Sequence, residues 1–544
     1  MSSSRVKELQ YGGIEIPIDS TNSAPSDKEE KDGVNLVTFR HAGLLVSTLF
    51  AGVFNTCLKR GLLPLLQAEL ELETYQADAA NMLMLLPWSY VFIWGFLSDA
   101  MPLLVLNYTL EYNALSSEVT ERAVLGHRMI LINAYIGLLM MASFGSVLAL
   151  VIAETYVVTQ TRRERLQERG RALGTLLMTQ FIGEFFGQIA TDEIIFNITT
   201  FGITPLYSFR DTALFFMFYS LVPLLAVLSL FRENSDPPAI NDEGANYAVD
   251  NSQMFARAER SRRSSSSCLK RSGKALHLNW TRLRTSLGKE AATRVIRFLM
   301  IFIFLSEFTL TYPHAKLEEW CNVTDKAKSS GDITMEAFYI IAVSAWKYCA
   351  INCNWRWCVS ASLILIMMTP QVLYFFMAAL AENTRSAEAF MFISSLRGFL
   401  RAALIILEVI FSAEIAPVGG EGAFVGIIVS MSSVMRLLAT SSSNALGYVF
   451  ENGNYTESEE SSQVAFALGV CYSIRLMGVV ALLFLPRQKE ELQLLLRYGA
   501  QGDKGTTWWV LGSLGCAFLV CTIFNLLAVI PSTSCLRIVG GSGC

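Results

Sequence analysis

Charged side chains recur at helical spacing inside one of the most apolar stretches of the sequence. In residues 388–411, Arg397, Arg401 and Glu408 stand at positions i, i+4 and i+11. At 100° per residue, an α-helix brings these three side chains to within about 40° of one face. A guanidinium group matches planar carboxylates and stacks on aromatic rings, and a nearby carboxylate can take up a proton. The spacing therefore predicts a polar helix face that binds an anion.

Further cations lie on other apolar stretches. Arg436 belongs to a stripe of polar residues at every fourth position in residues 422–449, and Lys347 and Arg475 lie on neighbouring stretches. These positions favour one anion-binding site between helices. The residues predicted to bind the solute are Arg397, Arg401, Arg436 and Lys347.

The N-terminal part of the chain contributes acids instead. Glu154 lies near the end of residues 130–155, and Glu184 lies between Gln180 and Gln188 on one side of the next apolar stretch. A cavity with acids on one side and cations on the other suits an anion that moves together with a proton. The acids predicted to exchange this proton are Glu154, Glu184 and Glu408. The alternative is that all these charges pair within the protein and only hold its helices together.

The composition indicates which elements position these residues. The chain has 544 residues, of which 52% are hydrophobic and 17% charged, and its mean hydropathy is +0.41. Apolar runs of roughly 18–25 residues recur throughout, long enough to cross the hydrocarbon core of a bilayer. A charge inside such a run costs at least ~2.5 kcal/mol, so the charged residues should face the interior of a helical bundle. The chain is therefore predicted to be an all-α polytopic membrane protein.

Twelve spans are predicted from these runs, and a weaker crossing is needed between residues 104 and 129 to keep the basic loops on one side. The predicted spans contain no HExxH, GxSxG or paired-aspartate pattern, which argues against an enzyme. The spans cover residues 42–64, 81–103, 130–155, 172–195, 211–231, 295–313, 335–352, 358–381, 388–411, 422–449, 463–485 and 507–530.

Orientation follows from the basic segments. Residues 161–171 and 256–297 are rich in Lys and Arg, which places both in the cytoplasm. Asn197, Asn322 and Asn454 begin glycosylation sequons in loops that this scheme puts outside. Asn279 also fits the sequon but lies in a basic cytoplasmic segment, so we interpret it as a chance match.

Two groups of about six helices joined by a long cytoplasmic loop are typical of major facilitator transporters. We therefore expect a major facilitator-type bundle of about 12–13 transmembrane helices in two halves. The predicted parts are a disordered tail at 1–36, an N-terminal half at 37–231, a disordered basic cytoplasmic loop at 232–293, a C-terminal half at 294–485, and a cytoplasmic loop with an extra membrane helix at 486–544.

Two polar sites at cytoplasmic helix ends are candidates for a gate between the halves. Gly95 and Asp99 close the stretch "LPWSYVFIWGFLSDAMP", where glycine permits a close helix approach and aspartate can cap a helix or bind a cation. Arg356 lies in "NWRW" at the end of a later span. The alternative for "NWRW" is an aromatic belt at the membrane surface with a snorkelling arginine.

The sequence resembles the folate-biopterin transporter family in several patches. The stretch "LPWSYVFIWGFLSDAMPL" is similar to the proline-tryptophan helix of that family, and "EIAPVGGEGAFVGIIVSMSSV" is similar to its late signature. "NWRW" and the tail "LPRQKEELQLLLRYGAQGDK", followed by "IPSTSC", look like its protist-type branch. The resemblance implies a major facilitator fold and proton-driven uptake of folate, biopterin or a related pterin. It also matches Asp99 and Glu421 to acids of the family, and we assign Glu421 to the gate.

The chain departs from the family pattern at two places. The basic stretch expected after Asp99 is missing, and only Glu154 remains where the family has three acids on its fourth helix. A role for that helix therefore rests on Glu154 alone. The alternatives are a carrier of another organic anion, or a membrane sensor or scaffold that transports nothing.

No cofactor is predicted. Cys349, Cys353 and Cys358 lack a nearby histidine or acid, which argues against a metal site, and Cys535 and Cys544 could pair if the C-terminal tail lies outside. The predicted partners are a small anionic solute, protons and the lipid bilayer, with no nucleic acid. The predicted location is the plasma membrane.

Overall fold

The structure is a computed structural model, and its described residues all belong to one compact unit that begins at Val34. Asp99, Asn454, Cys535, Cys544 and the doubtful crossing at 104–129 lie outside the residues or side chains that it describes. It describes residues 36–38, 41–62, 64–65, 86–100, 128–162, 164–199, 202–230, 268–417, 419–451, 457–499, 504–529, 533 and 536.

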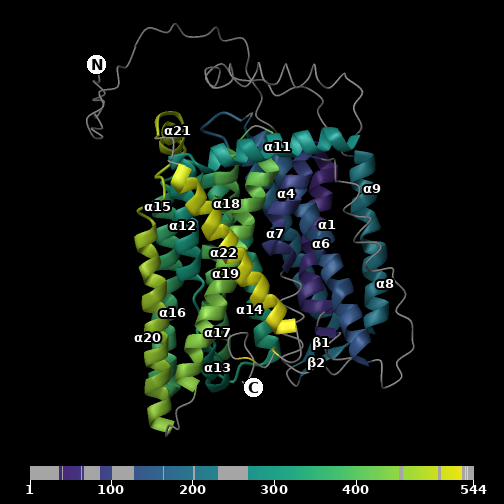
Figure 1. Ribbon diagram of the computed structural model, residues 1–544. Coiled ribbons are helices and arrows are strands. Elements are labelled where there is room, and N and C mark those ends of the chain that lie inside the picture. The colour runs from purple at the N-terminus through teal and green to yellow at the C-terminus, as the bar shows by residue number, and fades with distance from the viewer. Residues whose placement is uncertain are drawn as a thin grey trace, which may run out of the picture. The chain divides into compact units, whose positions relative to one another are not determined.

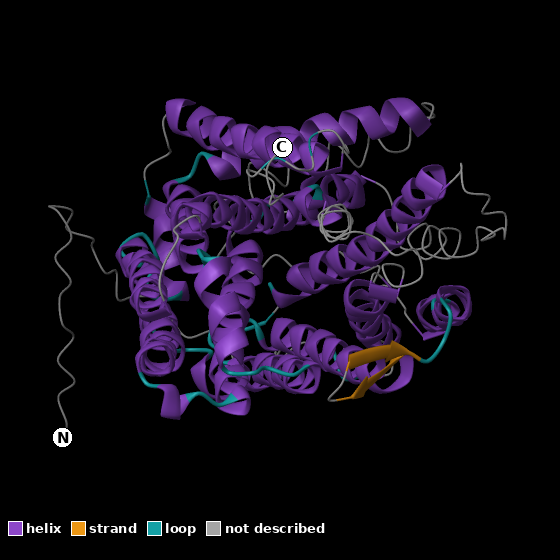
Figure 2. Ribbon diagram, turned by 90° about the horizontal axis from the view of Figure 1, so that it is seen from below, coloured by secondary structure: helices purple, strands orange, loops and turns teal. Residues whose placement is uncertain are grey.

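The N-terminal half is built from long helices and one short hairpin (Figure 1). In the hairpin, strands β1 (Phe196–Thr199) and β2 (Gly202–Pro205) run antiparallel, and Figure 2 shows them beside the helix ends. The hairpin was not predicted. The helical elements are α1 (Ala42–Cys57) with its continuation η2 (Leu58–Leu62), α4 (Val91–Ala100), α6 (Arg128–Thr161), α7 (Arg171–Ala190) with η4 (Thr191–Ile195), α8 (Phe209–Tyr219) and α9 (Leu221–Leu230).

The C-terminal half follows helix α11 (Cys268–Leu287), which crosses the helix ends at the top of Figure 1. Two further helices, α21 (Lys489–Tyr498) and α22 (Lys504–Val529), complete the chain. The elements between them are α12 (Glu290–Ser306), α13 (Thr311–Trp320), α14 (Asp325–Ala345) with η6 (Trp346–Ala350), α15 (Trp355–Ala361), η7 (Ser362–Met368), α16 (Thr369–Leu380), η8 (Glu382–Thr384), α17 (Ala387–Ser395), α18 (Arg397–Ile415), α19 (Glu421–Glu451) and α20 (Glu457–Ala481).

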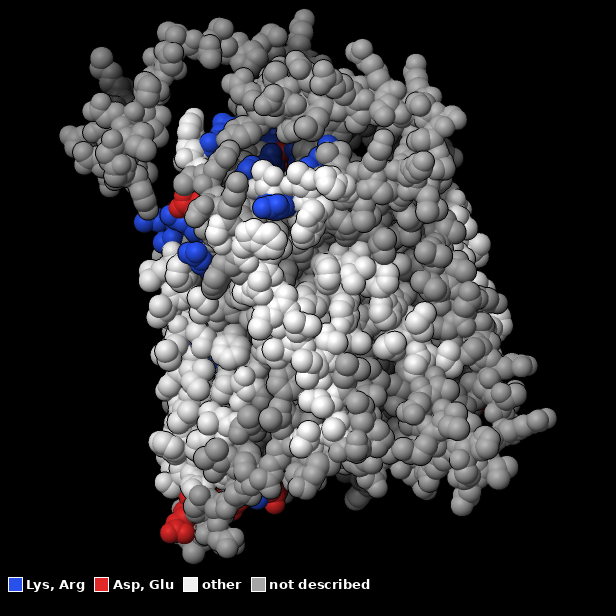
Figure 3. Space-filling view, in the orientation of Figure 1, with Lys and Arg blue, Asp and Glu red and all other residues white. Residues whose placement is uncertain are grey.

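Each of the twelve predicted spans overlaps a helix or a pair of helices. In the described part of the chain, six helices are long and apolar enough to cross a membrane, and α12 with α13 makes a seventh if the bent pair is one span. Figure 3 shows the matching surface: an uncharged band separates basic side chains at the end near α11 from acidic ones at the other end. The prediction of a polytopic membrane protein is confirmed.

The basic loop between the halves is more structured than the sequence suggested. Residues 232–293 were expected to be disordered, but α11 forms within them and α12 begins at Glu290. Helix α11 is amphipathic, and it buries Leu283 and Leu287 while exposing Trp280. This apolar face explains the error, because the prediction weighed the high charge of the loop and not its helical period. Asn279 is also buried in α11, in agreement with its interpretation as a chance sequon.

A bend of 41° separates α12 from α13 and leaves backbone carbonyl groups without helical partners. Arg475 of α20 fills this gap, because its Nε donates to the Phe308 carbonyl oxygen at 2.7 Å and its guanidinium also binds Thr309 and Gln371. A broken membrane helix needs such substitutes, since lipid offers no hydrogen bonds. The break brings Glu307, the residue that ends α12, into the bundle.

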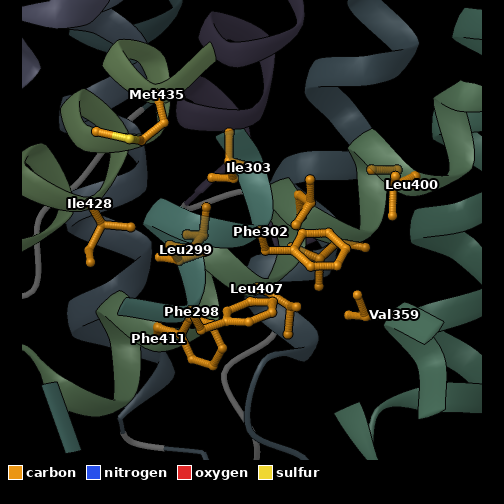
Figure 4. Close-up of a cluster of buried hydrophobic side chains, with 14 of the residues drawn as sticks. Phe298, Leu299, Phe302, Ile303, Val359, Leu400, Leu407, Phe411, Ile428 and Met435 are labelled. Carbon is orange, nitrogen blue, oxygen red and sulfur yellow. The ribbon is translucent and has the colours of Figure 1, made fainter. Parts of the chain in front are cut away.

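The apolar core of the C-terminal half packs between α12, α18 and α19 (Figure 4). Phe298 and Phe302 lie one turn apart on α12 with ring centroids 5.2 Å apart, and Phe411 of α18 meets Phe298 edge-on. All three rings are buried. The core therefore fixes α12 and α18 side by side, one or two turns from their charged residues.

Glycines set the closest helix contacts. Helices α1 and α7 touch backbone to backbone at Gly52 and Gly183, and α4 touches α19 at Gly95. A Cβ atom on Gly95 would lie 1.9 Å from the carbonyl oxygen of Gly422. Small residues at such crossings are typical of membrane helices. The interpretation of Gly95 as a close-approach residue is therefore supported.

Replacing Gly95 with alanine should force α4 and α19 apart. Overpacking of this kind costs about 1–3 kcal/mol, so we expect Gly95→Ala to lower the melting temperature of the purified protein. Gly137→Ala on α6 is the matched control, because a Cβ atom there meets nothing within 4 Å. Equal melting temperatures for the two variants would contradict the close contact.

Candidate functional site

Arg401 and Glu307 form a two-pronged ion pair inside the C-terminal half. Nε of Arg401 donates to Oε1 of Glu307 at 3.0 Å, and one terminal nitrogen donates to Oε2 at 2.9 Å. The guanidinium comes from the first turns of α18, and the carboxylate from the break after α12. This fork-to-fork geometry is the strongest arrangement of these two groups. Glu307 was not singled out from the sequence.

Arg436 of α19 extends this pair toward Glu408. Its terminal nitrogen donates to Oε1 of Glu408 at 3.0 Å, and its Nε lies 4.0 Å from Oε1 of Glu307. We call Arg397, Arg401, Arg436, Glu307 and Glu408 the arginine group. Two arginines of this group, Arg401 and Arg436, are therefore neutralised by glutamates of the same group.

Arg397 completes the arginine group without a partner of its own. Within the described residues it makes neither an ion pair nor a hydrogen bond, and its side chain is exposed. It lies within electrostatic range of Arg401 on its own helix, and of Glu307 directly after α12, Tyr339 of α14 and Arg475 of α20. An accessible side chain among three helices faces the interior of the bundle and not lipid. Arg397 therefore offers a free cation there.

Two predicted acids approach each other across the halves. Glu154 of α6 is buried and lies close enough to Glu408 of α18 for the two carboxylates to repel. Glu154 has no hydrogen bond or ion pair in the described part of the chain. One carboxylate without a cation beside another is the arrangement in which a proton is readily held.

A second polar group joins the halves at the end of α1. Lys59 lies within electrostatic range of Glu184 on α7, Glu336 on α14 and Arg401, and its ammonium is 5.8 Å from the ring centre of Trp88. Arg60 forms an ion pair with Asp332 of α14. We call Lys59, Arg60, Glu184, Asp332 and Glu336 the junction group.

Four of the five junction residues, all except Glu184, were missed in the sequence. Lys59 and Arg60 fall near the end of the span 42–64, and Glu336 near the start of 335–352. A charge this close to a span end looks like an ordinary boundary residue. One feature of the sequence could have identified Glu336 as a functional residue. It lies in the apolar stretch "ITMEAFYIIAV" with no cation near it in sequence.

Lys347 does not join the arginine group. It lies in η6, which continues α14. Its ammonium donates to Oγ1 of Thr175 in the first turns of α7, at 2.8 Å. The structure thus brings three of the four predicted solute-binding cations together and separates the fourth.

Charged side chains also tie the halves together at the end of the bundle that carries the basic segment 161–171. Arg162 after α6 pairs with Glu421 of α19 at 3.1 Å, and Arg169 pairs with Glu414 of α18 at 3.0 Å. Glu421 also accepts from the backbone N–H of Gly419. We call Arg162, Arg169, Glu414 and Glu421 the inner latch. Of these, only Glu421 was predicted as a gate residue.

The loop that carries the arginines of the inner latch is itself anchored. Glu164 accepts hydrogen bonds from the N–H groups of Gly170 and Ala172, at 2.6 and 2.9 Å, and so caps the start of α7. Burial raises the pKa of the Glu164 carboxyl. Lys489 of α21 donates to the carbonyl oxygen of Arg169 at 2.7 Å, and burial lowers the pKa of its ammonium.

The remaining predicted gate and surface residues have separate positions. Arg356 donates to the backbone carbonyls of Leu485 and Leu483, at 2.5 and 3.4 Å, and so binds α15 to the end of α20. Asn322 is exposed in the turn between α13 and α14, with a φ of 49°. Asn197 lies in β1, and its side chain is outside the described part.

The Arg401–Glu307 pair can be tested through stability. Removing one partner of a fully buried ion pair costs about 3–5 kcal/mol, and the cost should be smaller here because Arg401 keeps 36% and Glu307 15% of its side-chain surface. We expect Arg401→Met and Glu307→Gln each to lower the free energy of unfolding by about 2 kcal/mol, and the double variant to lose less than their sum. Denaturant titration of the purified protein measures all three.

The exposed pair Lys328–Glu318 provides a control for this cycle. Its side chains keep 56% and 39% of their accessible surface, so Lys328→Ala should change the unfolding free energy by less than about 1 kcal/mol. Strict additivity of Arg401→Met and Glu307→Gln would show that the two side chains do not interact.

Comparisons with known proteins identify the architecture. No family model matches the sequence, and no curated protein matches it. Among solved structures, the major facilitator superfamily proton:xylose symporter XylE, bound to 6-bromo-6-deoxy-D-glucose, is similar with a TM-score of 0.50 and 13% identity. The match covers 84% of this chain and 99% of the symporter.

A second solved structure is the major facilitator superfamily transporter FucP in its outward conformation. It has a TM-score of 0.46 and 12% identity, and the match covers 82% of this chain and 98% of that one. The likeness to the symporter extends over nearly all of that chain. The protein is a polytopic membrane protein with the major facilitator fold.

Proposed function

We propose that this protein is a secondary transporter that moves an organic anion across a membrane by alternating access, together with a proton. The observation that carries the proposal is Arg397, an accessible cation among three helices with no ion pair in the described residues. Keeping an unpaired charge within the bundle is costly. That cost is reasonable if a solute anion supplies the missing partner.

The charge balance of the arginine group supports an anionic solute. Its three arginines face two glutamates, and both glutamates are already bound by Arg401 and Arg436. An anion with a carboxylate would restore balance at Arg397. A planar ring could also stack on the guanidinium or on Tyr339, which lies beside it.

The acids support movement of a proton in the same cycle. Glu154 and Glu408 lie close together, and only Glu408 has a cationic partner. In the junction group three carboxylates face two cations, so a single proton would balance that group as well. The xylose symporter with a similar fold is described as proton-coupled, and we propose the same for this chain.

Alternating access requires contacts between the halves that can open. The inner latch and the Arg60–Asp332 pair are polar contacts between the halves, and the two latch glutamates are buried. When the halves separate, water that enters between them can hydrate both partners of each pair. We propose that the inner latch opens when the solute leaves toward the cytoplasm.

The sequence resemblance narrows the solute to folate, biopterin or a related pterin, taken up at the plasma membrane. The chemistry of these compounds suits the site. All of them have a planar ring that can stack on a guanidinium group, and folate also has carboxylates that can pair with one. Another organic anion is the second candidate, and the arginine group would serve it equally.

Uptake measurements test the proposal. In cells that lack folate and biopterin uptake, the wild-type chain should accumulate labelled folate or biopterin, and faster when the outside is more acidic. Loss of a hydrogen bond to a charged group costs about 1.5–3 kcal/mol, so Arg397→Ala should reduce uptake about 10- to 100-fold. Glu154→Gln should leave uptake insensitive to the pH gradient.

Arg171→Ala is the matched control, since this arginine is exposed and, among the described residues, forms its ion pair with Glu168 on the surface. Surface labelling must show equal amounts of each variant. No uptake of either compound by protein at the cell surface would contradict the pterin assignment. Uptake unchanged by Arg397→Ala would contradict the site.

A further inference from the structure

Three cysteines cluster where α14 turns back into α15. Cys349 and Cys353 are exposed, and Cys358 is half-buried close to Cys353. The described residues contain no group of three or more side chains arranged to hold a metal ion. The proposed transport cycle uses none of these thiols.

This turn lies at the cytoplasmic end of the helices. Trp355 donates its backbone N–H to the carbonyl oxygen of Arg487 at 2.8 Å, and Gln488 binds the carbonyl of Asn352. A Cβ atom on Gly170, in the basic segment 161–171, would touch Trp346 at 2.9 Å. The cysteines thus share one end of the bundle with the segments whose basic residues mark the cytoplasmic side.

Cys349 continues a stripe of exposed apolar side chains along α14 and η6. Ile341, Ala345 and Cys349 recur at every fourth residue and are all exposed, as is Tyr348 beside them. Inside an apolar span, a continuous exposed apolar stripe faces lipid. The thiol of Cys349 therefore lies at the edge of the bilayer.

Cys353 has a similar position on the other side of the turn. It directly precedes the apolar span Trp355–Leu380, and Trp357 and Leu365 of that span are 70% and 65% exposed. An exposed tryptophan at the end of a span is typical of the membrane–water boundary. Both exposed thiols therefore sit at headgroup depth, next to surface on which an acyl chain can lie.

The charge around the turn is that of a segment at a membrane surface. Residues 346–358 contain Lys347 and Arg356 and no acid, and the exposed Arg487 lies against Trp355. Cations at this depth attract the phosphates of lipid headgroups and of acyl-coenzyme A. Juxtamembrane cysteines in such surroundings are the usual sites of S-acylation.

We propose that Cys349 and Cys353 are S-acylated with long-chain fatty acids. The thiol sulfur attacks the carbonyl carbon of a long-chain acyl-coenzyme A and forms a thioester, in a transfer catalysed by a separate membrane acyltransferase. The bond from that carbon to the sulfur of coenzyme A breaks, and coenzyme A leaves as a thiol with the proton that the cysteine gives up. No oxidation or reduction takes place.

Acyl chains at these positions would hold the turn at the cytoplasmic leaflet. Each buried methylene contributes about 0.8 kcal/mol to membrane attachment. The turn supports the inner latch, because Trp346 packs under Gly170 beside Arg169. S-acylation would therefore stabilise the closed cytoplasmic end.

The full-length protein, purified from cells with protein acyltransferases, tests this modification directly. Trypsin cuts after Lys347 and Arg356 and releases residues 348–356, which contain Cys349 and Cys353 but not Cys358. Mass spectrometry should find this peptide carrying one or two long-chain acyl groups that neutral hydroxylamine removes. Only unmodified or disulfide-linked peptide would overturn the proposal.

Variants give a second readout by gel shift. After free thiols are blocked and thioesters are cleaved with hydroxylamine, a maleimide polymer should shift the wild-type band. The shift should disappear in the Cys349→Ser/Cys353→Ser double variant and persist in Cys321→Ser, which removes a buried thiol elsewhere. A shift that persists in the double variant would overturn the assignment. If that variant misfolds, mass spectrometry of the wild-type peptide still tests the proposal.

Discussion

Glu307 is the residue on which the charged interior of this protein depends. An arginine inside a membrane bundle without a counter-charge costs a few kcal/mol, and Glu307 shares its carboxylate between Arg401 and Arg436. It reaches them because α12 ends at this residue and the chain bends. The bend in turn leaves carbonyls that Arg475 satisfies, so one carboxylate links the geometry of α12, α18, α19 and α20.

The bundle is held together by two kinds of contact, close backbone contacts at glycines and ion pairs between the halves. Backbone-to-backbone contacts at glycines, such as that between Gly52 of α1 and helix α7, hold helices at fixed distances and tolerate no added atom. The halves also meet through ion pairs near their ends, such as Arg162–Glu421. The proposed transport cycle needs both kinds of contact, since the halves must keep their shape while the passage between them opens.

Local periodicity was predictable, and long-range pairing was not. The shared helix face of Arg397, Arg401 and Glu408 follows from 3.6 residues per turn, and all three belong to the arginine group. Their pairing was not predicted, because Glu408 was the only acid on the same helix face. In the structure, Arg401 binds Glu307 and Glu408 binds Arg436. Lys347 was predicted with the arginines because the depth of each residue in its span was not considered, and its ammonium instead donates to Thr175 of α7.

The sequence by itself determined the membrane class, the positions of nearly all the helices and the identity of most charges inside them. Hydropathy and helical period are properties of neighbouring residues, so they can be read along the chain. Only the tertiary structure decided which charges neutralise one another and that Arg397 remains unpaired among the described residues. Pairing depends on which helices become neighbours and at what depth, and residues as distant as Glu307 and Arg401 meet only when the bundle has formed.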